Sequence, residues 1–252
     1  MKNIRIIPRL DIKGSNVVKP VQADALRIVG SPHELAQRYY RDGADELLYL
    51  DIVASLYGRS IDLNLLRSVT ENIFIPMTVG GGVQSVQNAR NILRFGADKI
   101  AVNTYAIRRP ALIRELADEF GSQCVVLSIE AKRQPGNWWE AYTDGGREHS
   151  GRNVIDWVQE ALTLGAGEIL LTSIDADGRR VGYDVELLQQ VAAVARIPII
   201  IYGGAQSPQS LYEAIENGAD AVAAATIFHY NEYSIHETKG YLQEKGVSIR
   251  TL

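Results

Sequence analysis

Four short glycine motifs recur along this chain at matching intervals, and they constrain its fold more than any other feature. The motifs RDGAD, RFGAD, TLGAG and ENGAD contain Gly43, Gly96, Gly165 and Gly218. Within each pair the glycines are 53 residues apart, and the second pair follows the first by 122 residues. Many helices end at a glycine because only glycine readily adopts the left-handed conformation. The spacing therefore predicts an internal duplication, with halves of about 1–122 and 123–252.

Eight apolar runs rich in β-branched residues alternate with amphipathic stretches. The runs are IRIIPRL, ELLYLDI, IPMTVGG, KIAVNT, CVVLSIE, EILLTSID, IPIIIYGG and DAVAAAT. Alternating strands and helices predict a parallel sheet covered by helices. A length of 252 residues suits one such sheet closed into a cylinder. We therefore predict a single α/β domain, a (β/α)8 TIM barrel over residues 1–252, built from two duplicated half-barrels.

Composition excludes several classes of partner. The formal charge is −4, with 26 basic and 30 acidic residues interspersed, so no basic stripe favours binding of nucleic acid or a membrane surface. Cys124 is the one cysteine, and the four histidines have no metal-ligand spacing, so we expect no metal site and no cofactor. No signal-peptide core and no membrane-length apolar run occurs, which favours a cytoplasmic location.

Two equivalent strand ends carry carboxylates. The runs IIPRLDIKG and VVLSIEAKR correspond under the duplication, and their residues Asp11 and Glu130 are 119 positions apart. The C-terminal ends of barrel strands are where such folds place an acid and a base, so we predict that these two side chains face each other there. Alternatively, each carboxylate caps its strand or pairs with a neighbouring lysine, Lys13 or Lys132.

The duplication also doubles two glycine-rich loops. TVGGG, ending at Gly82, matches IYGGA, which contains Gly204, and VNTYA matches AATIF. Backbone N–H groups at such loops and at helix N-termini bind phosphate. Each glycine run alone is also typical of a tight turn, but a symmetric pair predicts a small-molecule ligand with a phosphate at each end.

The motifs LDIKG, TVGGG, GADKIAVNT, WEAYTDGGR and DADG resemble those of the cyclase subunit of imidazole glycerol phosphate synthase, and the likeness covers nearly the whole chain. The resemblance implies a lyase of histidine biosynthesis that takes ammonia from a partner glutaminase. Its substrate, phosphoribulosyl-formimino-aminoimidazole carboxamide ribotide, yields imidazole glycerol phosphate and aminoimidazole carboxamide ribotide. It also implies a heterodimer in which the glutaminase docks on the N-terminal face of the barrel.

Residue roles follow from the same resemblance. Asp11 and Glu130 take the places of the general base and the general acid, and Lys19 reaches a substrate phosphate. One phosphate is expected at Gly82, Asn103 and Thr104, and the other at Asp177, Gly178, Gly204, Ala225 and Thr226. Four inward-pointing charges at strand starts are expected to form an ammonia gate: Arg5, Glu46, Lys99 and Glu168. A simple plug of ion pairs closing the barrel floor is the compatible alternative.

Three positions depart from the family pattern. Glu130 replaces the usual aspartate, while Arg9 and Tyr202 replace small residues on the barrel axis. A buried guanidinium needs an anion, and Asp11 and Glu130 are the nearest candidates for Arg9.

These changes keep alternative functions open. The first is a cyclase-like paralogue that conducts ammonia from a glutaminase for amidination of surface-polysaccharide sugars. The others are an isomerase of the sister family and a barrel that only docks a glutaminase.

Overall fold

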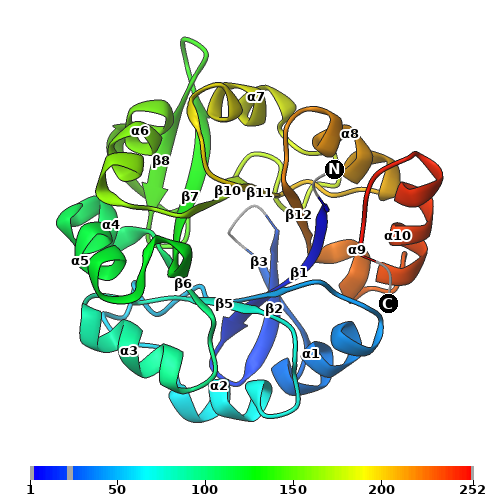
Figure 1. The fold of residues 1–252 in the computed structure, drawn as a ribbon, viewed down its shortest axis with the longest axis horizontal. Coiled ribbons are helices and arrows are strands. Elements are labelled where there is room, and N and C mark those ends of the chain that lie inside the picture. The colour runs from blue at the N-terminus through cyan, green and yellow to red at the C-terminus, as the bar shows by residue number, and fades with distance from the viewer. Residues whose placement is uncertain (1–2, 22–24, 251–252) are drawn as a thin grey trace.

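The computed structural model of the protein describes residues 3–21 and 25–250. Eight parallel strands pair in the order β10–β11–β12–β1–β4–β5–β6–β7, and pairing of β7 with β10 closes the cylinder (Figure 1). The barrel strands are β1 (Arg5–Lys13), β4 (Leu47–Asp51), β5 (Met77–Gly80), β6 (Lys99–Val102), β7 (Val125–Gln134), β10 (Glu168–Ser173), β11 (Ile199–Tyr202) and β12 (Ala221–Ala224). The predicted (β/α)8 barrel is confirmed, and all eight predicted runs contain barrel strands.

Helices surround the cylinder and cover its outer face (Figure 1). They are α1 (Pro32–Arg41), α2 (Leu63–Thr70), α3 (Val86–Arg94), α4 (Thr104–Arg108), α5 (Ala111–Phe120), α6 (Val154–Leu164), α7 (Val185–Val194), α8 (Pro208–Glu216), α9 (Thr226–His229) and α10 (Ile235–Glu244), with a 3-10 turn at Ser122–Cys124. None of the helices in the described ranges is long and apolar enough to span a membrane.

Side chains alternate between two apolar clusters along each barrel strand. In β1, Ile6 and Leu10 belong to the large cluster between barrel and helices, whereas Ile7 belongs to a smaller one that fills the barrel interior. Successive strand residues point to opposite faces, so Arg9 and Asp11 follow Ile7 on the inner face. The apolar residues of the sequence thus fix which polar side chains face the axis.

The glycine motifs end helices as predicted. The φ angles of Gly43, Gly96, Gly165 and Gly218 are 88°, 100°, 99° and 107°. Three of the motifs end in aspartates, Asp45, Asp98 and Asp220, which accept the N–H groups of Ile6, Met77 and Ile199. The fourth ends in Gly167, where a Cβ atom would lie 2.0 Å from the carbonyl oxygen of Ser122. Close packing therefore explains the one missing aspartate.

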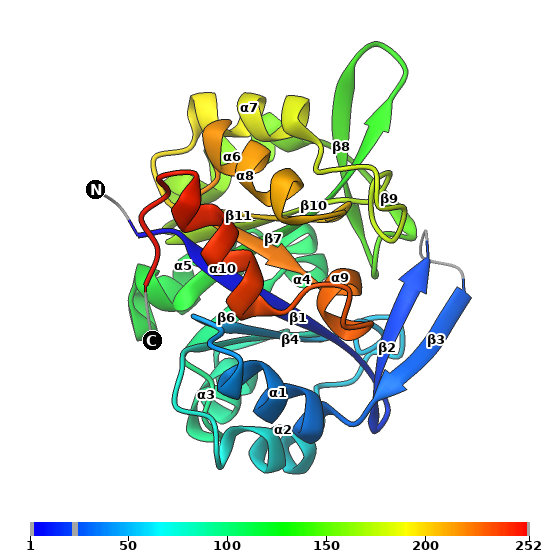
Figure 2. The ribbon, with the colours of Figure 1, turned by 90° about the vertical axis from the view of Figure 1, so that its right-hand side faces the viewer.

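Two antiparallel hairpins extend the barrel beyond its strand ends. One joins β2 (Asn16–Val21) to β3 (Ala25–Gly30) after β1, and the other joins β8 (Trp138–Thr143) to β9 (Glu148–Asn153) after β7. Figure 2 shows both on the right, at the C-terminal face of the barrel. One extension in each half agrees with a duplication, and the division near residue 122 stays a prediction.

Candidate active site

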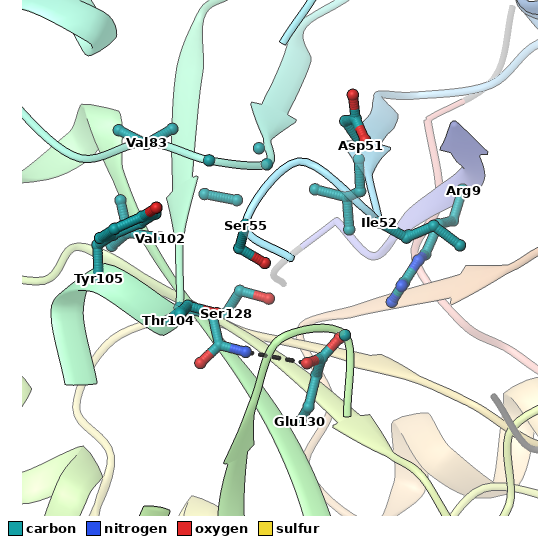
Figure 3. Close-up of a pocket in the computed structure, with 17 residues that line it drawn as sticks. Arg9, Asp51, Ile52, Ser55, Val83, Val102, Thr104, Tyr105, Ser128 and Glu130 are labelled. Atoms are coloured by element: carbon teal, nitrogen blue, oxygen red, sulfur yellow. Dashed lines mark hydrogen bonds between the residues drawn. The ribbon is translucent and has the colours of Figure 1, made fainter. Parts of the chain in front are cut away.

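The two predicted carboxylates lie at the same end of the barrel, on β1 and β7. Glu130 and Arg9 line one cavity and point into it from different sides (Figure 3). The same two side chains also line an adjoining cavity near Thr172 and Asp177. The alternative pairing with Lys13 or Lys132 does not occur, because Asp11 pairs with Arg9 and Glu130 bonds with Asn103.

Asp11 is held by an internal arginine. Its Oδ1 atom accepts a hydrogen bond from Arg9 Nε at 2.7 Å, and only 1% of Asp11 is exposed. Its other oxygen, Oδ2, has no hydrogen-bond partner within the described protein. The carboxylate thus has one oxygen anchored by a cation and one free to accept a proton.

Glu130 forms no ion pair with a lysine or arginine of the described residues. Its Oε2 atom accepts a hydrogen bond from Asn103 Nδ2 at 3.0 Å. Burial raises the pKa of Glu130 to about 7; the charge of Arg9 and an N–H of Gly146 act against this rise, while the charges of Asp11 and Asp177 add to it. Such a carboxyl exchanges its proton near neutral pH, as a general acid must.

The raised pKa predicts a pH-dependent effect on stability. The pKa of Glu130 is about 7 in the folded protein and about 4.3 in the unfolded chain, so the unfolded chain loses this proton first as the pH rises. The free energy of unfolding therefore decreases between about pH 4.3 and about pH 7, and the loss is complete above about pH 7. Glu130→Gln should therefore raise Tm at pH 8 and change it little at pH 4. About 1 kcal/mol corresponds to about 2–4 °C in a chain of this size. Thermal melts at both pH values test this, and an equal change at both would contradict it.

One glycine-lined hollow lies between β5 and β6. Gly82, Asn103 and Thr104 all line the cavity that contains Glu130. Gly82 has a φ of +65°, and a Cβ atom there would lie 2.0 Å from the carbonyl oxygen of Arg59. Thr104 Oγ1 accepts the N–H of Asp144 at 2.9 Å. The structure therefore brings the three residues of the first predicted phosphate site together.

A second glycine-lined hollow lies beside β11 and β12. It is lined by Tyr202 and by all five residues predicted for the other phosphate: Asp177, Gly178, Gly204, Ala225 and Thr226. Gly204 has a φ of +98°, and an added Cβ atom would lie 2.0 Å from the carbonyl oxygen of Gly182. The backbone here has no room for a larger residue.

Lys19 reaches this second hollow from the β2–β3 hairpin. Its Nζ atom donates to Asp177 Oδ1 at 2.7 Å and to the hydroxyl of Tyr202 at 2.8 Å. Burial opposes the charged form, but the charges of Tyr202, Asp177 and Asp11 raise the pKa of Lys19 above its ordinary value. A phosphate bound here would share this ammonium group with Asp177.

The four charges predicted for the barrel floor form a closed quartet. Arg5 bonds to Glu46 at 2.7 Å and to Glu168 at 2.5 Å. Lys99 bonds to the same two carboxylates at 3.0 and 2.7 Å. Each cation therefore bridges both anions, and Thr78 adds a hydrogen bond to Glu46 at 2.6 Å.

Sequence reasoning missed the contribution of the turn between β8 and β9. Gly145 and Gly146 have φ angles of 70° and 79°, and with Arg147 they line the cavity walls beside Glu130. Asp144 anchors this turn through an ion pair with Arg108 at 2.6 Å. The signal was present as TDGGR within WEAYTDGGR, a motif to which no residue role was assigned. In the described ranges, no group of acidic, histidine and cysteine side chains could hold a metal ion.

These features define a class: (β/α)8 barrels that have two carboxylates and two glycine-lined hollows at the C-terminal ends of their strands. Within it, residues 5–234 match the family model described as histidine biosynthesis protein. Proteins named imidazole glycerol phosphate synthase subunit HisF are similar to the chain. Those of Dehalococcoides mccartyi and Dictyoglomus turgidum are each 49% identical, over 99% and 98% of both chains. That of Legionella pneumophila is 55% identical over 81% of this chain and 96% of its own. The chain belongs to this family, the cyclase subunit of imidazole glycerol phosphate synthase.

Proposed function

We propose that the chain is an ammonia-dependent cyclase of histidine biosynthesis. It would convert phosphoribulosyl-formimino-aminoimidazole carboxamide ribotide to imidazole glycerol phosphate and aminoimidazole carboxamide ribotide. The observation that carries the proposal is that Glu130 lines the first glycine-lined hollow and an adjoining cavity that reaches Asp177 of the second hollow, while Arg9, the partner of Asp11, lines both cavities around Glu130. A substrate with a phosphate at each end fits that arrangement, because its middle would lie beside the carboxylates.

The two hollows receive the phosphates in this proposal. Gly82, Asn103 and Thr104 take one, where α4 begins, and the five residues around Gly204 take the other, where α9 begins. Backbone N–H groups at helix starts and glycine loops suit an anion. Lys19 adds a positive charge at the second hollow.

The carboxylates divide the proton transfers. Asp11 acts as general base through its free Oδ2 atom. Glu130 acts as general acid, because its pKa of about 7 keeps a substantial protonated fraction at neutral pH. Two carboxyl groups in different environments are a common basis for such a division.

A glutaminase is the proposed partner, docked on the N-terminal face in a cytoplasmic heterodimer. This is the face where β1 begins and where the floor quartet lies. Ammonia released there would enter through the quartet, which would serve as the gate. Asp98, next to Lys99 of the quartet, accepts the N–H of Met77 at 2.8 Å and so supports this face of the barrel.

Breaking the quartet should uncouple glutamine hydrolysis by the partner from consumption of the ribotide by this chain. Lys99→Met removes one bridge and leaves Glu46 and Glu168 facing each other with Arg5 alone. We expect the complex to consume more glutamine for each product formed, because ammonia escapes at the disturbed floor. The ratio of glutamate released to ribotide consumed measures this. Arg152→Met, which removes a surface pair with Glu160, is the matched control, and an equal ratio in both variants would count against a gate.

The proposed function is tested by a steady-state assay of the purified chain with the ribulosyl ribotide and excess ammonium at mildly alkaline pH. Turnover within the enzymatic range of about 1–10³ s⁻¹ supports the cyclase. Binding without consumption would contradict it and direct attention to amidated sugars. The comparisons do not favour that alternative, because the relatives named above match this chain over most of their length.

A further inference from the structure

Arg9 is an interior charge that the roles above do not use. It is 4% exposed and lines both cavities that contain Glu130. Its Nε atom donates to Asp11 at 2.7 Å, and its Nη1 atom donates to Thr172 Oγ1 at 3.2 Å. An arginine buried this deeply requires a counter-anion, and Asp11 supplies it.

Tyr202, which lines the second hollow, also contacts the guanidinium of Arg9. The centre of its ring lies 4.0 Å from Arg9 Cζ, which is the geometry of a cation–π contact. Its hydroxyl accepts a hydrogen bond from Lys19, which is paired with Asp177. The ring is therefore fixed at both ends, and the plane of Arg9 is fixed with it.

The two carboxylates consequently meet different surroundings. Asp11 has a dedicated cation, whereas the side-chain bond to Glu130 comes from the neutral amide of Asn103. We propose that Arg9, supported by Tyr202, is a positioning residue that holds Asp11 in place as the base through its Oδ1 atom and leaves the transferable proton on Glu130. The division of roles between the two carboxylates is then set by a third residue. This inference rests on the proposed function.

Groups from several elements face Glu130. From β1 come Arg9 and Asp11, from the end of β6 comes Asn103, and from the loop after β10 comes Asp177. The β8–β9 turn contributes the N–H of Gly146 and, along the second cavity, Arg147. The charge of Arg9 lowers the pKa of Glu130, and the charge of Asp11 raises it. Loss of either charge should move the titration of Glu130, in opposite directions.

The first test needs no substrate. Infrared difference spectra follow protonated carboxyl groups above about pH 6, where exposed aspartates and glutamates with pKa values of about 3.9 and 4.3 are already ionised. In the wild type we expect a carboxyl band with a midpoint near the Glu130 pKa of about 7. Glu130→Gln should abolish the band, and Asp11→Asn should keep it at a lower midpoint. A band that disappears in Asp11→Asn would overturn the proposal.

Arg9→Met extends this test. We expect the Glu130 midpoint to rise, because the charge of Arg9 lowers the pKa of Glu130. An unchanged spectrum would overturn the proposal. The double variant Arg9→Met with Asp11→Asn removes both members of the ion pair, and it should fold and keep the Glu130 band. Loss of that band in the double variant would overturn the assignment of the transferable proton to Glu130.

Kinetics at constant free ammonia give a further readout. Wild-type kcat/KM should fall as the pH rises through about 7, because Glu130 loses its proton. Arg9→Met should lower kcat/KM because Asp11 loses its anchor, and the fall in activity with rising pH should move to higher pH together with the Glu130 midpoint. Arg9→Lys and Tyr202→Phe should retain most of the wild-type pH profile of kcat/KM, because each keeps a cation or an aromatic ring in place. Tyr202→Leu should show the same change in the pH profile as Arg9→Met.

Two outcomes separate this inference from the proposed function. If the wild type and the variants show the expected carboxyl bands but the wild type never consumes the ribotide, the role of Arg9 stands and the proposed substrate fails. If the ribotide is consumed but the pH profile of Arg9→Met matches the wild type, the inference fails and the cyclase stands.

Discussion

Glu130→Gln is expected to lower ammonium-dependent turnover by about 10²–10⁴-fold, which is the usual contribution of a positioned general acid. The amide occupies nearly the same volume and can still contact Asn103, whose Nδ2 atom lies 3.0 Å from the wild-type carboxylate. What it cannot do is release a proton. The decline of activity above about pH 7 should disappear together with the titrating group. Steady-state rates of the ribotide reaction between about pH 6 and 9 measure both effects.

The matched variant for this position is Glu130→Asp, which restores the carboxylate usual in the family but shortens the side chain by one methylene. It should retain far more activity than the amide, because it keeps the acid. Affinity for a bis-phosphate ligand should change much less than turnover, since Glu130 borders the first glycine-lined hollow and is absent from the lining of the second. Full activity in Glu130→Gln would remove Glu130 from the mechanism.

Asp11→Asn is expected to cause a loss of similar size, about 10²–10⁴-fold, for a different reason. The asparagine oxygen can still accept the Arg9 Nε–H group that Asp11 accepts at 2.7 Å, so the side chain should stay in place. Its nitrogen would occupy the position of the free Oδ2 atom, and a proton-accepting site would become a donor.

The pH profile distinguishes this variant from Arg9→Met. Loss of the Asp11 charge lowers the Glu130 pKa, so the fall in activity should move to lower pH, whereas Arg9→Met should move it to higher pH. Calorimetric binding of a bis-phosphate analogue should show nearly wild-type affinity. Unaltered ammonium-dependent turnover would mean that another group is the base, and a lost affinity would mean that Asp11 holds the substrate instead.

The sequence predicted the barrel because its apolar runs and its glycines are local signals. Each strand run is β-branched, and each helix-ending glycine adopts the left-handed conformation that its position requires. The residues of each predicted phosphate set lie together in one hollow, because the strand ends of a closed parallel barrel meet at one face, and phosphate binding there stays a prediction. Local sequence patterns were sufficient to predict the location of a residue wherever its place on a barrel strand fixes that location.

Local sequence patterns did not predict which side chains pair with one another inside the barrel. The sequence left Asp11 and Glu130 as equal candidates for Arg9, and the structure selects Asp11, two residues along the same strand face. The contact between Lys19 and Asp177 joins residues 158 positions apart, through a hairpin that no local pattern indicated. Such pairings depend on how loops cross the barrel mouth, and that is a property of the whole molecule.

The carbonyl oxygen of Ser122, which leaves no room for a side chain at Gly167, limits how this protein could be rebuilt from one of its halves. Under the proposed duplication, position 167 corresponds to Asp45, 122 residues earlier. A chimera of two first halves would bring an aspartate into a space where even a Cβ atom lies 2.0 Å from Ser122 O. The halves are therefore not interchangeable modules, and a symmetric design must redraw the joint at Ser122–Cys124 before the second half can close the cylinder.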